Sequence, residues 1–260
     1  MESRLSKALE RTYILCIFAF LYVPIAIIIM YSFNAAKSNI VFSGFTLDWY
    51  TKLFNDDDVI TALVNSLTIA TVSTCISAII GTVGAIGLKR HNFKGKGLIS
   101  LLVYIPIVIP EIIMGISLLV FFSALQIDFG ILTLVLAHTT FCIPFVLINV
   151  KSRLAGFYLS IEEAAMDLGA SKLTVFRTIT LPLIFPAVVS GAMLAFALSL
   201  DDVIINFFVS GPGSTTLPIK IFSMLRFGLS PEINALCTIM LLTTFVVLIL
   251  SQGIKLRREK

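Results

Sequence analysis

Six long apolar runs constrain this 260-residue chain more than any other feature, because each run carries few or no charges. An α-helix needs about 20 residues to cross the hydrocarbon core of a bilayer, and each run is long enough. We place the runs at Tyr13–Phe33, Ala62–Leu88, Leu98–Leu125, Ile131–Val150, Leu183–Val209 and Ile233–Ile254. Hydrophobic residues make up 58% of the chain and charged residues only 13%. The sequence therefore predicts an all-α membrane protein with six transmembrane helices, a single domain over 1–260 with its core at 60–254.

The basic residues predict how these helices are oriented. Fifteen of the 19 Lys and Arg residues fall in the segments on one side of the six runs, and four fall on the other side. Cytoplasmic segments of membrane proteins carry the excess of Lys and Arg, so both termini are expected in the cytoplasm. The net charge of +4 then reflects topology and does not indicate nucleic-acid binding.

A polar segment between the fourth and fifth runs, within 152–182, is expected to form two short helices. Ser160 and Glu163 have the spacing of a capping box for the first helix. Gly169 stands where a left-handed residue would end it. Ser171 can cap the second helix, which is expected to end before Pro182. Such an elbow would project rigidly from the membrane. The alternative is one amphipathic helix lying on the lipid surface.

Three acidic residues lie inside the predicted spans: Glu111, Asp201 and Asp202. A carboxylate there costs about 2.5–3.5 kcal/mol on insertion scales, so each is a candidate functional residue. The apolar runs contain no Lys or Arg that could pair with these acids. Uncompensated negative charge along a path suits a cationic substrate. The alternative is that the acids are neutralised or capped structural groups, or that Asp202 reaches the outer interface.

Other residues with functional chemistry have simpler explanations. Trp49, the only tryptophan, is either an interfacial anchor or a cation–π partner for an amine at the outer mouth. His138 is expected to be a hydrogen-bonded packing residue. The cysteines lie in the predicted spans without metal or disulfide spacing, so no metal site is predicted; they are Cys16, Cys75, Cys142 and Cys237.

Several enzyme signatures are absent from the sequence. It contains no G-x-x-x-x-G-K-[ST] phosphate loop, so the chain is not expected to hydrolyse ATP. It also lacks H-E-x-x-H and G-x-S-x-G. An intramembrane aspartyl hydrolase needs two acids converging from different elements, and Asp201 and Asp202 are adjacent. That class stays a distant alternative.

The polar segment and five further segments carry a resemblance to a known family. Glu163, Ala164 and Ala165, then Gly169 and Leu181-Pro182, resemble the EAA loop of ABC-importer permeases. The chain also resembles the polyamine branch of that family in Phe20–Pro24, Asp48–Tyr50, Leu198–Val203, Leu217–Ile221 and Ser230–Ala235. Glu111 stands where that pattern has an aspartate, which keeps the charge.

The resemblance implies a function and a set of partners. It implies a type I permease fold and ATP-driven uptake of spermidine or putrescine across the bacterial inner membrane by alternating access. The expected partners are a homologous second permease, two ATPase subunits that bind ATP and Mg²⁺, and an extracytoplasmic polyamine-binding protein, all acting in the lipid bilayer. This chain itself is expected to bind no cofactor. The residues expected to couple to the ATPase are Glu163, Ala164, Ala165, Asp167, Gly169 and Ala170.

Other cargoes remain open within the importer class. A permease for ferric iron or for an oxyanion would share the EAA loop. An anion pathway should present basic side chains or helix N-termini to its cargo, and the acids within the spans argue against it.

The charge distribution yields a topology prediction. In a background without native cysteines, Asn55→Cys should react with an impermeant thiol reagent added outside cells. Ser171→Cys should react only after the inner face is exposed. The opposite labelling pattern would overturn the orientation.

Overall fold

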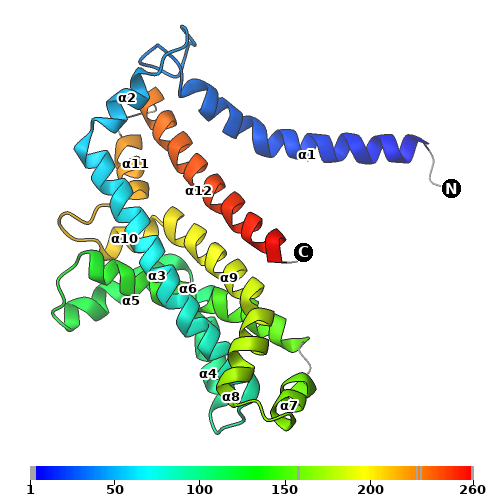
Figure 1. Ribbon diagram of the computed structural model, residues 1–260. Helices are drawn as coiled ribbons and strands as arrows, with labels where there is room; N and C mark the ends of the chain where they lie inside the picture. Colours follow the sequence, from blue (N-terminus) through cyan, green and yellow to red (C-terminus); the bar gives the residue numbers. More distant parts are fainter. Residues whose placement is uncertain (1–3, 157–158, 227, 229, 259–260) are drawn as a thin grey trace. The chain divides into compact units, whose positions relative to one another are not determined.

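The computed structural model describes residues 4–156, 159–226, 228 and 230–258, and apart from one isolated β-bridge its regular structure there is helical. The elements are α1 (Arg4–Tyr31), α2 (Asp48–Phe54), α3 (Asp57–Arg90), α4 (Lys96–Val108), α5 (Glu111–Ala124), α6 (Ile131–Ala155), α7 (Leu159–Asp167), α8 (Lys172–Val175), a π-helical turn η1 (Phe176–Thr180), α9 (Leu181–Asp201), α10 (Ile204–Val209), α11 (Leu217–Leu225) and α12 (Pro231–Arg258) (Figure 1). Every predicted apolar run thus coincides with one helix or a broken pair.

Within the described residues, four stretches are long and apolar enough to cross a membrane as unbroken helices. They are Leu9–Tyr31, Asp57–Arg90, Ile131–Ala155 and Lys172–Asp201. The α4–α5 pair makes a fifth span if its two bent halves are counted as one. The apolar stretch Pro231–Val246 of α12 is shorter. Six crossings and two cytoplasmic termini therefore remain predictions.

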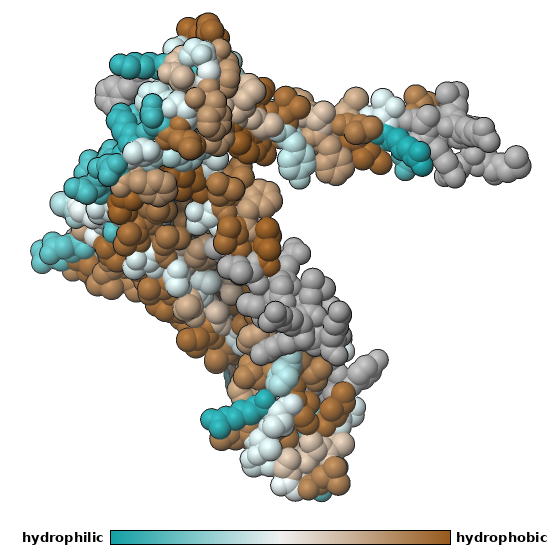
Figure 2. Space-filling view, turned by 45° about the horizontal axis from the view of Figure 1, so that its top comes forward, coloured by the Kyte–Doolittle hydropathy of each residue, from teal (hydrophilic) through white to brown (hydrophobic). Residues whose placement is uncertain are grey.

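The chain divides into two compact units. The first comprises Met1–Ile60 and Ile221–Thr243, and the second comprises Thr61–Lys220 and Thr244–Lys260. In the first unit, the most apolar window of α1 buries none of its residues. Figure 2 shows this helix covered with hydrophobic side chains along most of its length. A helix that is apolar on all sides and unburied is suited to contact with lipid.

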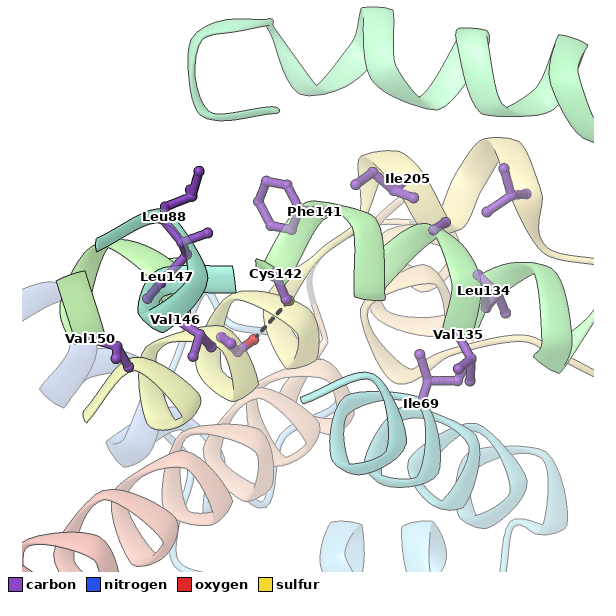
Figure 3. Packing of buried hydrophobic residues seen from close by; sticks show 14 of the residues in the cluster. Ile69, Leu88, Leu134, Val135, Phe141, Cys142, Val146, Leu147, Val150 and Ile205 are labelled. Carbon is purple, nitrogen blue, oxygen red and sulfur yellow. Dashed lines mark hydrogen bonds between the residues drawn. The ribbon is translucent and has the colours of Figure 1, made fainter. Parts of the chain in front are cut away.

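The core of the second unit is built around α6, which packs most extensively against α9 (Figure 1). Figure 3 shows Val146 and Leu147 of α6 within this core, together with the contact between the Cys142 thiol and the Ala195 carbonyl at 3.4 Å. Cys142 is fully buried there as a small side chain, as its place in the predicted span suggested.

Two glycines allow the central helices to approach one another. A Cβ added at Gly191 of α9 would lie 2.8 Å from the Cα of Val146. One added at Gly81 of α3 would lie 2.9 Å from the Cβ of the same Val146. Both distances are shorter than real Cβ contacts, so these positions require glycine. Small residues at close helix crossings are typical of membrane helix packing.

Two of the six predicted spans are broken in the structure. The run Leu98–Leu125 forms α4 and α5, bent by 110°. Pro110 precedes α5, and Ile109 before it takes the extended conformation that a following proline favours. The run Leu183–Val209 breaks at Asp202, which is extended and separates α9 from α10.

The second cytoplasmic helix was expected to end before Pro182, and that prediction is wrong. Helical structure continues from α8 through η1 into α9, with Pro182 in its first turn. Because the helix is continuous here, Pro182 removes one hydrogen bond of the helix backbone. The π-helical turn η1 widens the backbone just before this point.

The close helix crossing generates a stability prediction. Gly191→Ala should destabilise the protein by about 1–3 kcal/mol, because its methyl group meets the backbone of Val146. Gly87→Ala is the matched control, since a Cβ there meets nothing within 4 Å and alanine favours a helix. Thermal unfolding of the detergent-solubilised protein, followed by size-exclusion chromatography, measures both. An unchanged melting temperature for Gly191→Ala would contradict the crossing.

Candidate functional site

The two broken spans meet in the second unit. The short helix α10 packs against α5, where Gly115 faces the ring of Phe208 and the carbonyl of Ile204. A Cβ at Gly115 would lie 2.7 Å from that ring. The breaks thus bring Glu111, the first residue of α5, within electrostatic range of Asp201 and Asp202. We name these three acids at the two breaks, Glu111, Asp201 and Asp202, the acid cluster.

Asp202 occupies a buried, structured place in the acid cluster. Its residue is 7% exposed, and its carboxylate faces the N-terminus of α10. One oxygen accepts a hydrogen bond from the Asn206 amide at 2.9 Å, and the other accepts one from the Ile205 amide at 3.3 Å. These amides and the helix dipole compensate its negative charge. Asp202 is therefore a capped structural acid, which was the alternative that the sequence left open.

A buried polar network links His138 of α6 to both sides of the second break, the one at Asp202 between α9 and α10. His138 is fully buried, and its Nε2 lies 2.9 Å from Oδ1 of Asn206. Its Nδ1 lies 2.6 Å from the hydroxyl of Ser199. Because an amide oxygen only accepts, Nε2 donates its proton, and the Ser199 hydroxyl donates to the neutral ring. His138 is therefore a hydrogen-bonded packing residue, as predicted.

Glu111 and Asp201 are the exposed acids of the cluster, and their local fields differ. Glu111 lies at the N-terminus of α5, where the helix dipole favours negative charge. Asp201 is the last residue of α9, where the dipole opposes negative charge. In the part of the chain that the structure describes, neither carboxylate forms an ion pair with a basic side chain. Asp201 is thus the least compensated acid.

The acid cluster does not resemble a metal centre. Among the described residues, no group of three or more His, Cys, Asp or Glu side chains converges in a way that could hold a metal ion. Two oxygens of the cluster are already engaged by backbone amides of α10. The exposed carboxylates are free to contact a larger cation.

Trp49 belongs to the first unit and is held by an ordered loop. Its indole Nε1 donates to the carbonyl of Asn34 at 2.7 Å. The ammonium of Lys52 lies 6.0 Å from the centre of its ring, so a cation of the chain itself already approaches the ring. Asn34 is fully buried. Its amide group donates to the carbonyls of Ser38 and Val41 and fixes the loop.

The elbow of α7 and α8 forms through the predicted glycine turn. Gly169 has φ +91°, and its amide bonds to the carbonyl of Met166 at 2.9 Å. The amide of Ala170 bonds to the carbonyl of Ala165 at 3.0 Å, which completes a Schellman motif. The hydroxyl of Ser171 caps α8 by accepting from the Thr174 amide, as predicted.

The predicted capping box at the start of this elbow is wrong. Ser160 lies inside α7, which already includes Leu159, and a cap residue must stand outside the helix it caps. The candidate coupling residues are accessible: Glu163, Ala164, Asp167 and Gly169 are exposed, and Ala165 and Ala170 are half-buried.

The neighbouring Glu162 was missed by sequence reasoning. It is 6% exposed and forms an ion pair with Arg90 of α3. The available signal was its position beside Glu163, because adjacent residues on a helix cannot both face outward in the same direction.

The fold and sequence have close counterparts among known proteins. The chain is 44% identical over 256 residues to the spermidine/putrescine transport system permease protein PotC of Escherichia coli K12, which covers 98% of this chain and 97% of that protein. It is 46% identical over 250 residues to the putrescine transport system permease protein PotI of the same strain, covering 94% and 89%.

Solved structures share the fold at low sequence identity. A bacterial ABC transporter involved in the import of the acidic polysaccharide alginate matches with a TM-score of 0.75 and 18% identity, over 99% of this chain and 100% of that one. A chain of the inward-facing MetNI methionine ABC transporter matches with a TM-score of 0.66 and 18% identity, over 78% and 99%. The type I importer architecture expected from the sequence is therefore present.

The family model described as "binding-protein-dependent transport system inner membrane component" matches residues 76–258. That range contains the acid cluster and the elbow of α7 and α8. The chain is accordingly a multi-pass inner-membrane protein of transport type. It belongs to the binding-protein-dependent transport system inner membrane component family.

Proposed function

We propose that this chain is one permease subunit of an ATP-driven importer that takes up polyamines such as spermidine and putrescine. The assignment of a cationic substrate rests on the acid cluster. Its exposed carboxylates have no basic partner in the described part of the chain. Relatives whose names specify spermidine or putrescine transport support the same cargo.

A polyamine is a flexible chain with separated ammonium groups, and removing their water is costly. Carboxylates along a narrow path can replace that hydration while holding the cation weakly enough to release it. We assign direct contact to Asp201 and Glu111, the two exposed acids. Asp202 positions α10 through its two amide contacts and adds negative potential. Trp49 orders the outer segment through its hydrogen bond to Asn34, and its ring is a candidate cation–π partner for an amine.

The proposal includes partners that supply energy and specificity. A second permease completes the pathway, and two ATPase subunits hydrolyse ATP with Mg²⁺. An extracytoplasmic binding protein delivers the polyamine; a solved relative of the fold is an alginate transporter in complex with a substrate-bound periplasmic protein. ATP binding closes the ATPases and opens the pathway outward, and hydrolysis returns it inward.

The elbow of α7 and α8 is the docking element for the ATPase in this scheme. Its exposed Glu163, Ala164 and Asp167 and the neighbouring Ala165, Gly169 and Ala170 form the contact surface. The Schellman motif and the Ser171 cap fix the angle between the two helices. A fixed angle allows the elbow to transmit a force without bending.

Ferric iron and oxyanions fit the cluster less well. No metal-binding group is present among the described residues, and an oxyanion would be repelled by two exposed carboxylates. An intramembrane hydrolase would show activity without any ATPase, which separates it from both importer hypotheses.

The cargo assignment generates a mutational prediction. Asp201→Asn and Glu111→Gln should each lower polyamine uptake by about tenfold, the effect of losing roughly 1.4 kcal/mol of cation stabilisation. Glu111→Asp should be mildest, because it keeps the charge. Uptake of labelled putrescine and spermidine by the reconstituted complex measures the effect, with basal ATPase activity as the check on assembly.

Asp128→Asn is the matched control, since Asp128 is an exposed acid in the loop between α5 and α6. It should leave uptake unchanged. Wild-type uptake by both Asp201→Asn and Glu111→Gln would refute the cationic pathway.

The docking assignment generates a second prediction. Gly169→Val should abolish ATPase stimulation by the loaded binding protein, because a β-branched residue at φ +91° costs about 1–3 kcal/mol and turns α8 away. Gly169→Asn, which tolerates the left-handed conformation, should retain most stimulation. Equal stimulation in the two variants would exclude a docking role that depends on this turn.

A further inference from the structure

The helix α7 is attached to the rest of its unit through an unusual residue. Among the side chains of α7 that the structure describes, Glu162 alone is buried, at 6% exposure. The others lie at the surface or are half-buried, including the residues proposed to face the ATPase. The buried attachment of α7 is therefore the carboxylate of Glu162, on the side of the helix away from the residues proposed to bind the ATPase.

Three side chains from three elements meet at this anchor. Arg90, the last residue of α3, donates from Nη2 to Oε1 of Glu162 and to the hydroxyl of Thr180, the latter at 3.1 Å. Thr180, the last residue of η1, donates from its hydroxyl to the same Oε1 at 2.5 Å. Thr180 is fully buried. We call Arg90, Glu162 and Thr180 the anchor triad.

Burial of Glu162 and Thr180 makes the anchor triad specific, while the side chain of Arg90 stays 28% exposed. A carboxylate removed from water must be paired and hydrogen-bonded, and removing one partner leaves an uncompensated charge. Any tilt of α7 that would separate Glu162 from Arg90 and Thr180 is therefore opposed. A tilt that carries all three side chains along is not.

The two helices held by the anchor triad also meet near the acid cluster. α9 follows directly from Thr180 and ends at Asp201, a length of about 30 Å at 1.5 Å per residue. α3 leads back from Arg90, and its Ser73 lies 3.3 Å from Ser199 of α9. Ser199 is the partner of His138 in the network that holds the second break. Both helices thus connect the elbow with that network.

We propose that the anchor triad is the strut through which movement of α7 reaches α3 and α9 and, with them, the acid cluster. This inference rests on the proposed ATPase-docking role of the elbow. It assigns Arg90, Glu162 and Thr180 as positioning residues for transport, none of which contacts cargo or ATPase. Besides the hydrogen bond between Glu162 and Thr180, the chain itself links α7 to Thr180 through α8 and η1.

The test uses the reconstituted importer with Thr180→Val, which removes only the hydroxyl, and Arg90→Gln. The matched controls are Thr178→Val and Lys89→Gln; Thr178 and Lys89 are exposed neighbours outside the triad. Both triad variants should retain the ATPase subunits on purification. Binding-protein stimulation of ATP hydrolysis and putrescine uptake should fall at least about fivefold, the lower range of allosteric coupling energies.

Two rescue variants separate the strut from general packing. Thr180→Ser keeps the hydroxyl and should restore stimulation. The double exchange Arg90→Glu with Glu162→Arg should recover more activity than either single reversal, because it restores the ion pair. Loss of ATPase subunits from Thr180→Val would make the triad an assembly element and overturn the strut. Wild-type stimulation in both Thr180→Val and Arg90→Gln would overturn it equally.

A cargo-independent measurement distinguishes failure of the strut from failure of the polyamine assignment. Phe207→Cys places an exposed thiol on α10 in a background without native cysteines. Its alkylation rate should change when ATP is trapped with vanadate, and Thr180→Val or Arg90→Gln should abolish that change. A change of wild-type size in both triad variants, or no change with the triad intact, would overturn the strut. If the wild-type importer did not transport putrescine, the polyamine assignment would be refuted and the strut proposal would not be affected.

Discussion

The structure of the second unit depends on the contact that α6 makes with α3 and α9 at Val146. Lipid chains are as apolar as leucine, so apolar burial does not hold these helices together within a bilayer. Close van der Waals contact must do so, and it requires Gly81 and Gly191 to present bare backbone on opposite partners of one valine. The hydroxyls of Ser73 and Ser77 add hydrogen bonds along the same faces. With three helices fixed in this way, breaks elsewhere in the unit can be tolerated.

Those breaks reconcile buried charge with an apolar environment. A continuous helix at membrane depth would offer Asp202 no donor, because its backbone amides would be used within the helix. The extended residue at the break frees the first amides of α10, and the carboxylate accepts two of them. Asp201 lies one residue earlier at the opposite pole of a helix and receives no such compensation. Adjacent acids therefore differ in role: one shapes the site and the other presents its charge.

The elbow of α7 and α8 shows a similar division between neighbours. Glu163 is exposed on the surface available to a partner, while Glu162 is buried against Arg90 and Thr180. The Schellman turn at Gly169 keeps the two short helices at one angle, and η1 joins them to α9 without a flexible linker. A load on the outer face of α7 thus meets two connections, the ion pair of Glu162 with Arg90 and the helical path through η1 to α9.

The sequence by itself determined the membrane class, the positions of the helical segments, the glycine turn, the Ser171 cap and the identity of the acids. These follow from local properties: hydropathy, the freedom of glycine at positive φ, and the cost of charge in a span. The start of α7, the continuation through Pro182 and the breaks after Val108 and Asp201 depended on competition between neighbouring backbone preferences. Only the tertiary structure decided that Glu162 is buried and that α5 meets α10 at Gly115. Those outcomes require partners far apart in the chain, and a pattern read along one chain carries no information on which surfaces will meet.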